Sequence, residues 1–226
     1  METMIDQETE NALKMIASDR VRSNLLKTPE QRMLAYLVQR VPSWISSDML
    51  TFIGLLGSLT IMLSFILAAY IHKNLLLLGI LGFTINWLGD SLDGRLAFYR
   101  KKSRKWYGFA LDITIDWLSI IFVGWGYIIY TEGEWEVLGY GFVVLYGWSI
   151  INTLIKYKII GEYAIDPGLF GPTEGRILIS AILLTEVLVH GSIVYSLALL
   201  TVFILIINIF DSRKLLRLAD EWDRKK

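Results

Sequence analysis

Four aspartates stand out in a stretch of the chain whose flanking residues are almost all apolar. Asp90 and Asp93 are three positions apart, and Asp112 and Asp116 are four positions apart. Because residues three or four positions apart share a face of an α-helix, each pair predicts two carboxylates on one helix face. An ionised Asp in the middle of a membrane helix costs a few kcal/mol. We therefore expect the four side chains to face one another and to need compensating positive charge.

A pair of divalent cations is the expected source of that charge. Arg95 is the nearest arginine, and one guanidinium cannot balance four carboxylates. Carboxylate oxygens are hard ligands that suit Mg²⁺ or Mn²⁺. The chain has no Cys, and its two histidines, His72 and His190, lie in predicted loops far from the aspartates, so zinc, copper and thiol chemistry are not expected. The alternative is a set of aspartates that cap helices or line a water-filled vestibule.

The elements that must position these side chains are long apolar runs. The 226 residues are 54% hydrophobic, above the usual 45–50% of soluble domains. Each run has about the 17–25 residues that a helix needs to cross a bilayer. The sequence therefore predicts an all-α, six-transmembrane-helix bundle with flanking cytosolic or interfacial helices. The runs are roughly Met49 to Ile71, Leu75 to Phe98, Tyr107 to Tyr130, Val137 to Ile155, Thr173 to Val189 and Ile193 to Phe210.

The basic residues predict the orientation of this bundle. They gather before the first run, after the last run and in the two loops that contain Arg100 to Lys105 and Lys156 to Arg176. The opposite loops hold Lys73 as their only basic residue. By the positive-inside rule both termini face the cytosol. No signal peptide is expected before the first run, and the zero net charge gives no reason to expect a nucleic-acid partner.

Three parts of the chain follow from this pattern. Residues 1–41 form a cytosolic N-terminal amphipathic segment, 42–211 the six-helix membrane domain and 212–226 a cytosolic C-terminal tail. The end of the first segment could lie along the membrane surface with Trp44 at the headgroup level. It could equally be a solvated helix packed on the domain.

The stretch from Gly89 to Trp117 resembles the signature of the CDP-alcohol phosphotransferases, D-x-x-D-G-x-x-A-R-x(8 or 9)-G-x-x-x-D-x-x-x-D. Seven of its eight fixed positions are matched, and the arginine position holds Phe98. The resemblance extends over roughly Pro42 to Phe210, because the number of helices and the opening "SSDMLTFIGLLG" are also similar to the family. The matched positions are Asp90, Asp93, Gly94, Ala97, Gly108, Asp112 and Asp116.

The resemblance implies a metal-dependent enzyme of phospholipid biosynthesis. In this family an alcohol attacks the β-phosphorus of a CDP-linked donor, and CMP leaves. The resemblance implies that Asp90, Asp93 and Asp112 bind two Mg²⁺ or Mn²⁺ ions. It makes Asp116 either a further ligand or the general base that takes the proton of the acceptor.

Other matched positions would bind the substrate. Gly94 and Gly108 lack a Cβ, so that a nucleotide could approach the backbone closely, although tight helix packing is the ordinary reason for such glycines. Ala97 belongs to the same set. Because Phe98 replaces the family arginine, Arg95 or Arg100 could supply the cation for a phosphate, or the metals could carry the phosphate charge unaided.

The alcohol acceptor is the least defined part of the predicted reaction. The segment "GPTEG" is similar to choline and ethanolamine phosphotransferases, and Glu174 and Arg176 lie in or next to it as candidate binding residues. A polar alcohol phosphate would need several cations in the acceptor pocket, whereas this region mixes basic and acidic residues. We expect a neutral or lipid acceptor, with CDP-diacylglycerol or a CDP-aminoalcohol as donor. Membrane lipids and a second copy of the chain, in a homodimer, are the other expected partners.

A divalent-cation transporter, or a non-catalytic metal-dependent membrane scaffold, is the alternative function. A path across the membrane would need polar residues in the outer half as well. The outer parts of the second and third runs, "NLLLLGILGF" and "SIIFVGWGYIIY", contain almost none. This favours a site that opens to one side.

Overall fold

The computed structural model describes residues 27–160 and 171–224, and within them every regular element is a helix. Residues 1–26 and 161–170 lie outside the described residues. Two short 3₁₀ turns, η1 (Lys73–Leu76) and η2 (Gly133–Trp135), precede α4 and α6. The α-helices are α2 (Lys27–Val38), α3 (Ser47–Tyr70), α4 (Leu77–Tyr99), α5 (Lys105–Tyr130), α6 (Glu136–Ile160), α7 (Pro172–Leu188) and α8 (Ser192–Asp223).

Each predicted apolar run forms one long helix, which confirms the all-helical fold class. Local signals in the sequence explain where two of these helices begin. The Ser46 hydroxyl accepts a hydrogen bond from the Met49 amide at 3.1 Å and caps α3. Pro172 occupies the first turn of α7, as expected for a residue without an amide proton. The helix α8 continues well past the predicted end of its run, through the charged residues of the C-terminal tail.

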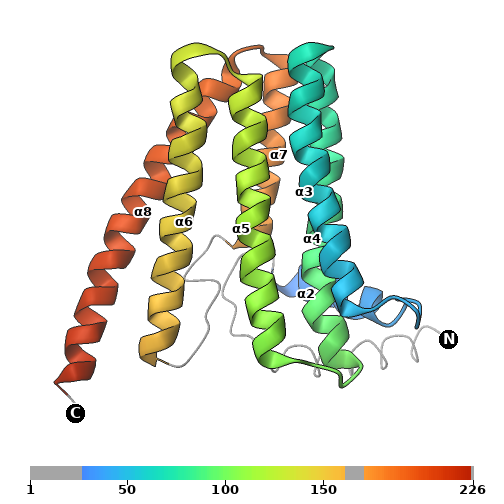
Figure 1. Ribbon diagram of the computed structural model, residues 1–226, viewed down its shortest axis with the longest axis vertical. Coiled ribbons are helices and arrows are strands. Elements are labelled where there is room, and N and C mark those ends of the chain that lie inside the picture. The colour runs from blue at the N-terminus through green and yellow to red at the C-terminus, as the bar shows by residue number, and fades with distance from the viewer. Residues whose placement is uncertain (1–26, 161–170, 225–226) are drawn as a thin grey trace.

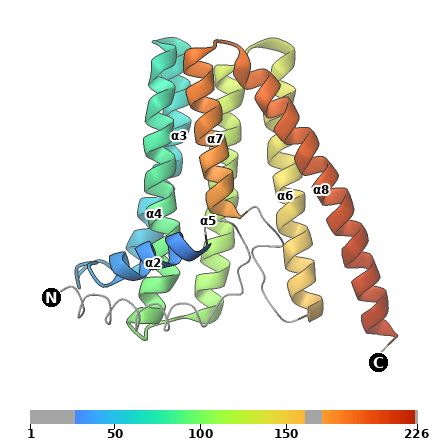
Figure 2. The same cartoon turned by 180° about the vertical axis from the view of Figure 1, so that it is seen from behind.

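The six long helices stand side by side, and α2 lies across the end of the bundle at which α3 begins (Figures 1 and 2). Its inner face, with Leu34 and Val38 fully buried, packs on Leu92 and Leu96 of α4. Its outer face exposes Met33 and other side chains, and Trp44 beyond it is also exposed. The helix is therefore packed on the domain, and Trp44 remains available for a membrane surface.

Five helices of the described chain, α3, α4, α5, α6 and α8, are long and apolar enough to cross a membrane. They identify a multi-pass membrane protein, and many large apolar side chains on their outer faces are exposed. The helix α7 has 17 residues and is not among the five. The count of six crossings is therefore not confirmed and remains a prediction.

Exposed aromatic side chains at the two ends of the bundle agree with a membrane location. Trp44 and Trp106 lie at the end that carries α2, and Tyr70, Trp135 and Tyr195 lie at the other end. Aromatic residues of this kind are enriched at the two interfaces of a bilayer. The apolar surface between the two groups is the part expected to contact lipid.

The helices α3 and α4 approach each other very closely. A Cβ atom on Gly57 would lie 2.4 Å from the backbone nitrogen of Asn86, and a Cβ atom on Gly89 would lie 2.4 Å from the backbone nitrogen of Gly54. Glycine is therefore required sterically at both contacts. This approach brings the polar side chains of α3 within reach of the aspartates of α4.

Candidate metal centre

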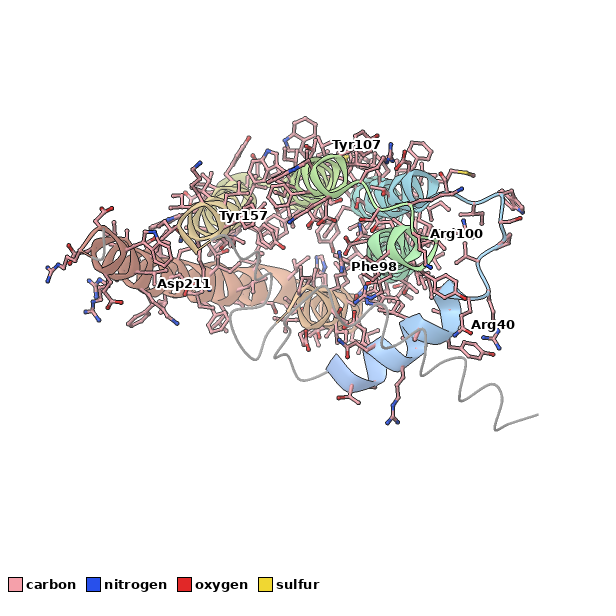
Figure 3. The ribbon with its side chains drawn as sticks, turned by 90° about the horizontal axis from the view of Figure 1, so that it is seen from below. Arg40, Phe98, Arg100, Tyr107, Tyr157 and Asp211 are labelled. Carbon is pink, nitrogen blue, oxygen red and sulfur yellow. The ribbon has the colours of Figure 1, made fainter. Side chains whose placement is uncertain are left out.

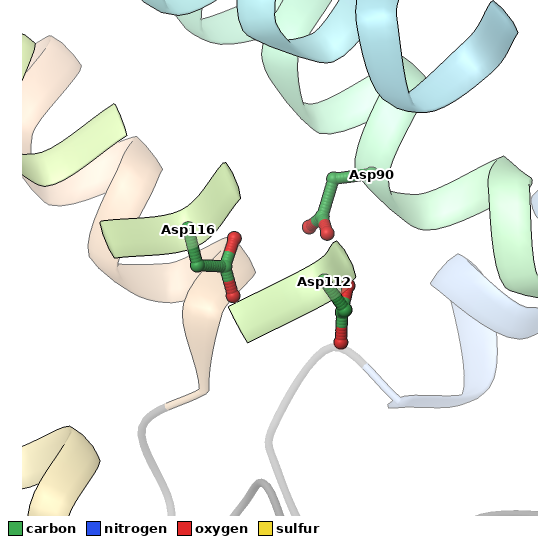
Figure 4. A group of neighbouring side chains, drawn as sticks. All are labelled: Asp90, Asp112 and Asp116. Atoms are coloured by element: carbon green, nitrogen blue, oxygen red, sulfur yellow. The ribbon is translucent and has the colours of Figure 1, made fainter. Parts of the chain in front are cut away.

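Three of the four aspartates come together at the end of the bundle that carries α2. Asp90 projects from α4, and Asp112 and Asp116 project from successive turns of α5 (Figure 4). Each offers a carboxylate oxygen, and these oxygens lie within 4.8 Å of one another. Oxygens that share one Mg²⁺ at about 2.1 Å are at most ~4.2 Å apart, so a small rotation of the side chains would let all three bind one ion. The donor set and its spacing therefore fit a hard divalent cation.

The fourth aspartate lines the same pocket but is held by the protein. Asp93 is buried, and its Oδ2 accepts a hydrogen bond of 2.6 Å from the Thr51 hydroxyl of α3. Its Oδ1 accepts a hydrogen bond from the Gly94 amide. These two contacts fix the carboxyl group of Asp93 beside the other three. The pocket is lined by Thr51, Gly54, Asn86, Asp90, Asp93, Asp112, Ile115 and Asp116.

The helix α3 assembles this site although it contributes no aspartate to it. It packs against both α4 and α5. Thr51, Gly54 and Ser58 are spaced by three and four positions, so they form one small and polar face of α3. The Ser58 hydroxyl donates to the Ser119 hydroxyl of α5 at 2.7 Å. The carboxylates of α4 and α5 therefore meet across a helix that leaves room for them.

An arginine of α7 contacts the aspartate cluster. The Nη2 of Arg176 donates to Asp90 Oδ2 at 2.6 Å, and its Nε donates to Asn86 Oδ1 at 2.8 Å. The side chain of Arg176 is only 15% exposed. One guanidinium supplies too little charge for four carboxyl groups, so the site still favours a divalent cation.

The other two candidate arginines donate to backbone carbonyls. Arg95 donates to the Ser91 carbonyl of its own helix. Arg100 donates from Nη2 to the carbonyls of Val41 and Pro42, at 2.9 Å each, and so holds the link between α2 and α3. Figure 3 shows Phe98 and Arg100 at the end of α4. Arg176 donates to a carboxylate of the cluster, that of Asp90.

The remaining candidate binding residues fall into two groups. Gly94 and Gly108 are exposed, and a Cβ on Gly108 would meet no described atom within 4 Å. These open surroundings favour access of a substrate, and not tight helix packing, as the reason for a glycine at position 108. Ala97 is half-buried on the same end of α4. Glu174 is buried in the first turn of α7, where its Oε2 accepts from the Gly171 amide at 3.0 Å, so this contact is structural.

Sequence reasoning missed Thr51, Ser58 and Asn86. Two signals could have found them. Asn86 lies four positions before Asp90 and hence on the same helix face. Thr51 and Ser58 are polar residues inside a run of apolar ones, on the face that also carries Gly54.

Comparison of the chain with protein families, with characterised proteins and with solved structures found no match.

Proposed function

We propose that this protein is a metal-dependent CDP-alcohol phosphotransferase. It moves a substituted phosphate group from a CDP-linked donor to an alcohol acceptor and releases CMP. The observation that carries the proposal is the meeting of Asp90, Asp112 and Asp116 within one small pocket, next to the buried Asp93. The spacing of these residues in the sequence is the feature that resembles the family.

The residues divide the chemistry as follows. Asp90, Asp93 and Asp112, with Asp116 as a further ligand, would hold two Mg²⁺ or Mn²⁺ ions. These ions would neutralise the diphosphate and stabilise the attacking and leaving oxygens. Asp116 takes the proton of the acceptor hydroxyl. The acceptor oxygen forms a bond to the β-phosphorus, and the bond between that phosphorus and the bridging oxygen breaks. CMP leaves with the electron pair of that bond.

The proposed topology has six crossings with both termini and the site on the cytosolic side. The sixth crossing is α7, whose 17 residues would span about 25 Å at 1.5 Å per residue. The orientation is supported by the basic residues at the α2 end, where Lys101 and Lys102 are exposed.

The substrates and partners follow from the same reasoning. The donor is CDP-diacylglycerol or a CDP-aminoalcohol, and we favour a neutral or lipid acceptor, since the described contacts engage Arg176, Arg100 and Arg95 with protein groups. The protein acts in phospholipid biosynthesis within the membrane. A homodimer is the proposed assembly.

A transporter would need a polar path from this site to the other end of the bundle. Beyond the aspartates lies a cavity whose lining is apolar apart from the Tyr127 hydroxyl. The lining residues are Phe65, Val123, Tyr127, Gly139, Phe142, Ile179, Ile182, Leu183, Ile193, Leu197 and Leu200. An apolar stretch of this kind is a barrier to an ion. The geometry therefore favours a site that opens at one end.

The test is CMP release by the purified protein. Radiolabelled CDP-diacylglycerol, CDP-choline and CDP-ethanolamine are offered separately, each with a panel of alcohol acceptors and with Mg²⁺ or Mn²⁺. We expect CMP release with one donor class, its loss with a chelator, and its loss in the folded variants Asp90→Asn, Asp93→Asn and Asp112→Asn. Wild-type turnover in any of these variants would contradict the proposed centre.

A further inference from the structure

Asn86 is a buried polar residue beside the aspartates that the chemistry above does not use. It lies on α4 one turn before Asp90 and is 6% exposed. A buried amide must have its hydrogen bonds satisfied, because an unpaired polar group in such a place is costly. Its partners therefore show what the side chain holds in place.

The amide nitrogen of Asn86 is fixed by α3. Its Nδ2 donates to the Gly54 carbonyl at 3.1 Å and to the Ser58 hydroxyl at 3.0 Å. Ser58 in turn donates to Ser119 of α5. The close approach of α3 and α4 at Gly57 makes this contact possible. With both amide protons directed to α3, the Oδ1 of Asn86 must face the opposite way.

That oxygen accepts from Arg176. The Nε of Arg176 lies 2.8 Å from Asn86 Oδ1, and its Nη2 lies 2.6 Å from Asp90 Oδ2. A guanidinium is planar and its N–H groups have fixed directions. Two contacts therefore fix the plane of Arg176. The Nη1 nitrogen makes no hydrogen bond to the residues that the structure describes, and the side chain keeps some exposed surface.

We propose that Asn86 is a positioning residue that holds the Arg176 guanidinium beside Asp90, where its remaining N–H groups contact the diphosphate of a bound nucleotide. The proposal rests on the function proposed above. The other oxygen of Asp90 takes no part in the ion pair with Arg176 and remains for a metal. Arg176 thereby supplies the phosphate contact that Phe98 cannot make at the arginine position of the motif. In this proposal Asn86 acts through its contact with Arg176.

The test is a double-mutant cycle on CDP binding. Calorimetry in detergent measures the Kd of CDP with saturating Mn²⁺ for the wild type, Asn86→Leu, Arg176→Met and the double variant. Loss of a charge-assisted contact should raise the Kd by about 10- to 100-fold in Arg176→Met. Loss of its positioning residue should raise the Kd by about tenfold or more in Asn86→Leu. Because both changes remove one interaction, the double variant should bind about as weakly as Arg176→Met.

Asn208→Leu is the matched control. Asn208 is also buried, and it donates to the Leu145 carbonyl and accepts from Ser149 in the α6–α8 contact, away from the aspartates. Its variant should bind CDP like the wild type. Asn86→Ala, which leaves room for a water, replaces Asn86→Leu if the leucine variant does not give a monodisperse protein.

The outcomes separate the two proposals. If the wild type shows no Mn²⁺-dependent CDP binding, the phosphotransferase proposal fails, and the role of Asn86 fails with it. If the wild type binds CDP and the Asn86 variants bind it equally well, only the positioning role is overturned. Losses that add in the double variant, or an equal loss in Asn208→Leu, would overturn it as well.

Discussion

The hydroxyl of Thr51 should be needed for activity although Thr51 carries no charge and belongs to a different helix from the aspartates. Its Oγ1 donates to Asp93 Oδ2 at 2.6 Å, and both residues are buried. A contact of this length to a carboxylate is a charge-assisted hydrogen bond. Without it, Asp93 would be free to rotate, and one of its oxygens would lose a partner.

The size of the effect follows from that contact. A hydrogen bond to a charged group contributes about 1.5–3 kcal/mol, which corresponds to about 10- to 150-fold in kcat/KM if the bond persists during turnover. The change is Thr51→Val, which replaces the hydroxyl by a methyl group of similar size. We expect kcat/KM for CMP release to fall within this range and the Mn²⁺ concentration for half-maximal activity to rise.

Two further variants isolate the hydroxyl. Thr60→Val makes the same substitution on the same helix, at a half-buried residue whose hydroxyl donates to the Leu56 carbonyl, and should have wild-type activity. Thr51→Ser keeps the hydroxyl and should recover most of the activity lost in Thr51→Val. Wild-type kcat/KM and Mn²⁺ dependence in Thr51→Val would refute the reasoning, as would an equal loss in Thr60→Val.

The remaining predictions concern topology, charge and stability. Single cysteines at Ser103 and Glu134, both exposed, should react with an impermeant thiol reagent from opposite sides of the membrane; labelling from one side would break the six-crossing topology. In Arg176→Lys, kcat/KM for CMP release should fall about tenfold, since lysine cannot make the same planar contacts with Asp90 and Asn86. The Glu186 carboxylate accepts from the Tyr130 hydroxyl and from two backbone amides at the start of α8. Glu186→Leu should therefore lower the free energy of unfolding by about 2 kcal/mol or more, measured by thermal denaturation. An unchanged melting temperature would argue against this.

The sequence predicted the helices well because their signals are local. Apolar runs of membrane length are bounded by charged loops, and most helix ends fall within two residues of the predicted ones. The end of α8 was missed, since its tail is amphipathic and continues the helix without an apolar run. Whether α7 crosses the membrane remains a prediction, because its 17 residues lie at the short limit for a bilayer.

The candidate site could be predicted only in part. The spacing of the aspartates predicted that Asp90, Asp112 and Asp116 would lie close together. This prediction needed no tertiary information within a helix, because residues three or four positions apart share one helix face. The partner of Asp90 could not be predicted in this way, since Arg176 is 86 positions away and reaches it only when α7 packs against α4. Arg95 was chosen for its closeness in sequence, and its described contact is with its own helix.

The role of α3 explains why the motif alone does not define the site. The aspartates of α4 and α5 would repel one another in an apolar bundle, and the helix between them must offer both space and hydrogen bonds. Gly54 offers space, while Thr51 and Ser58 offer hydroxyls to Asp93 and Asn86. A bulky apolar residue at Gly54 would fill the pocket and leave the carboxylates without room to converge. The chemistry of the four aspartates therefore depends on a helix whose contribution is visible only in the packing, and variants of α3 should affect metal binding as strongly as variants near the motif.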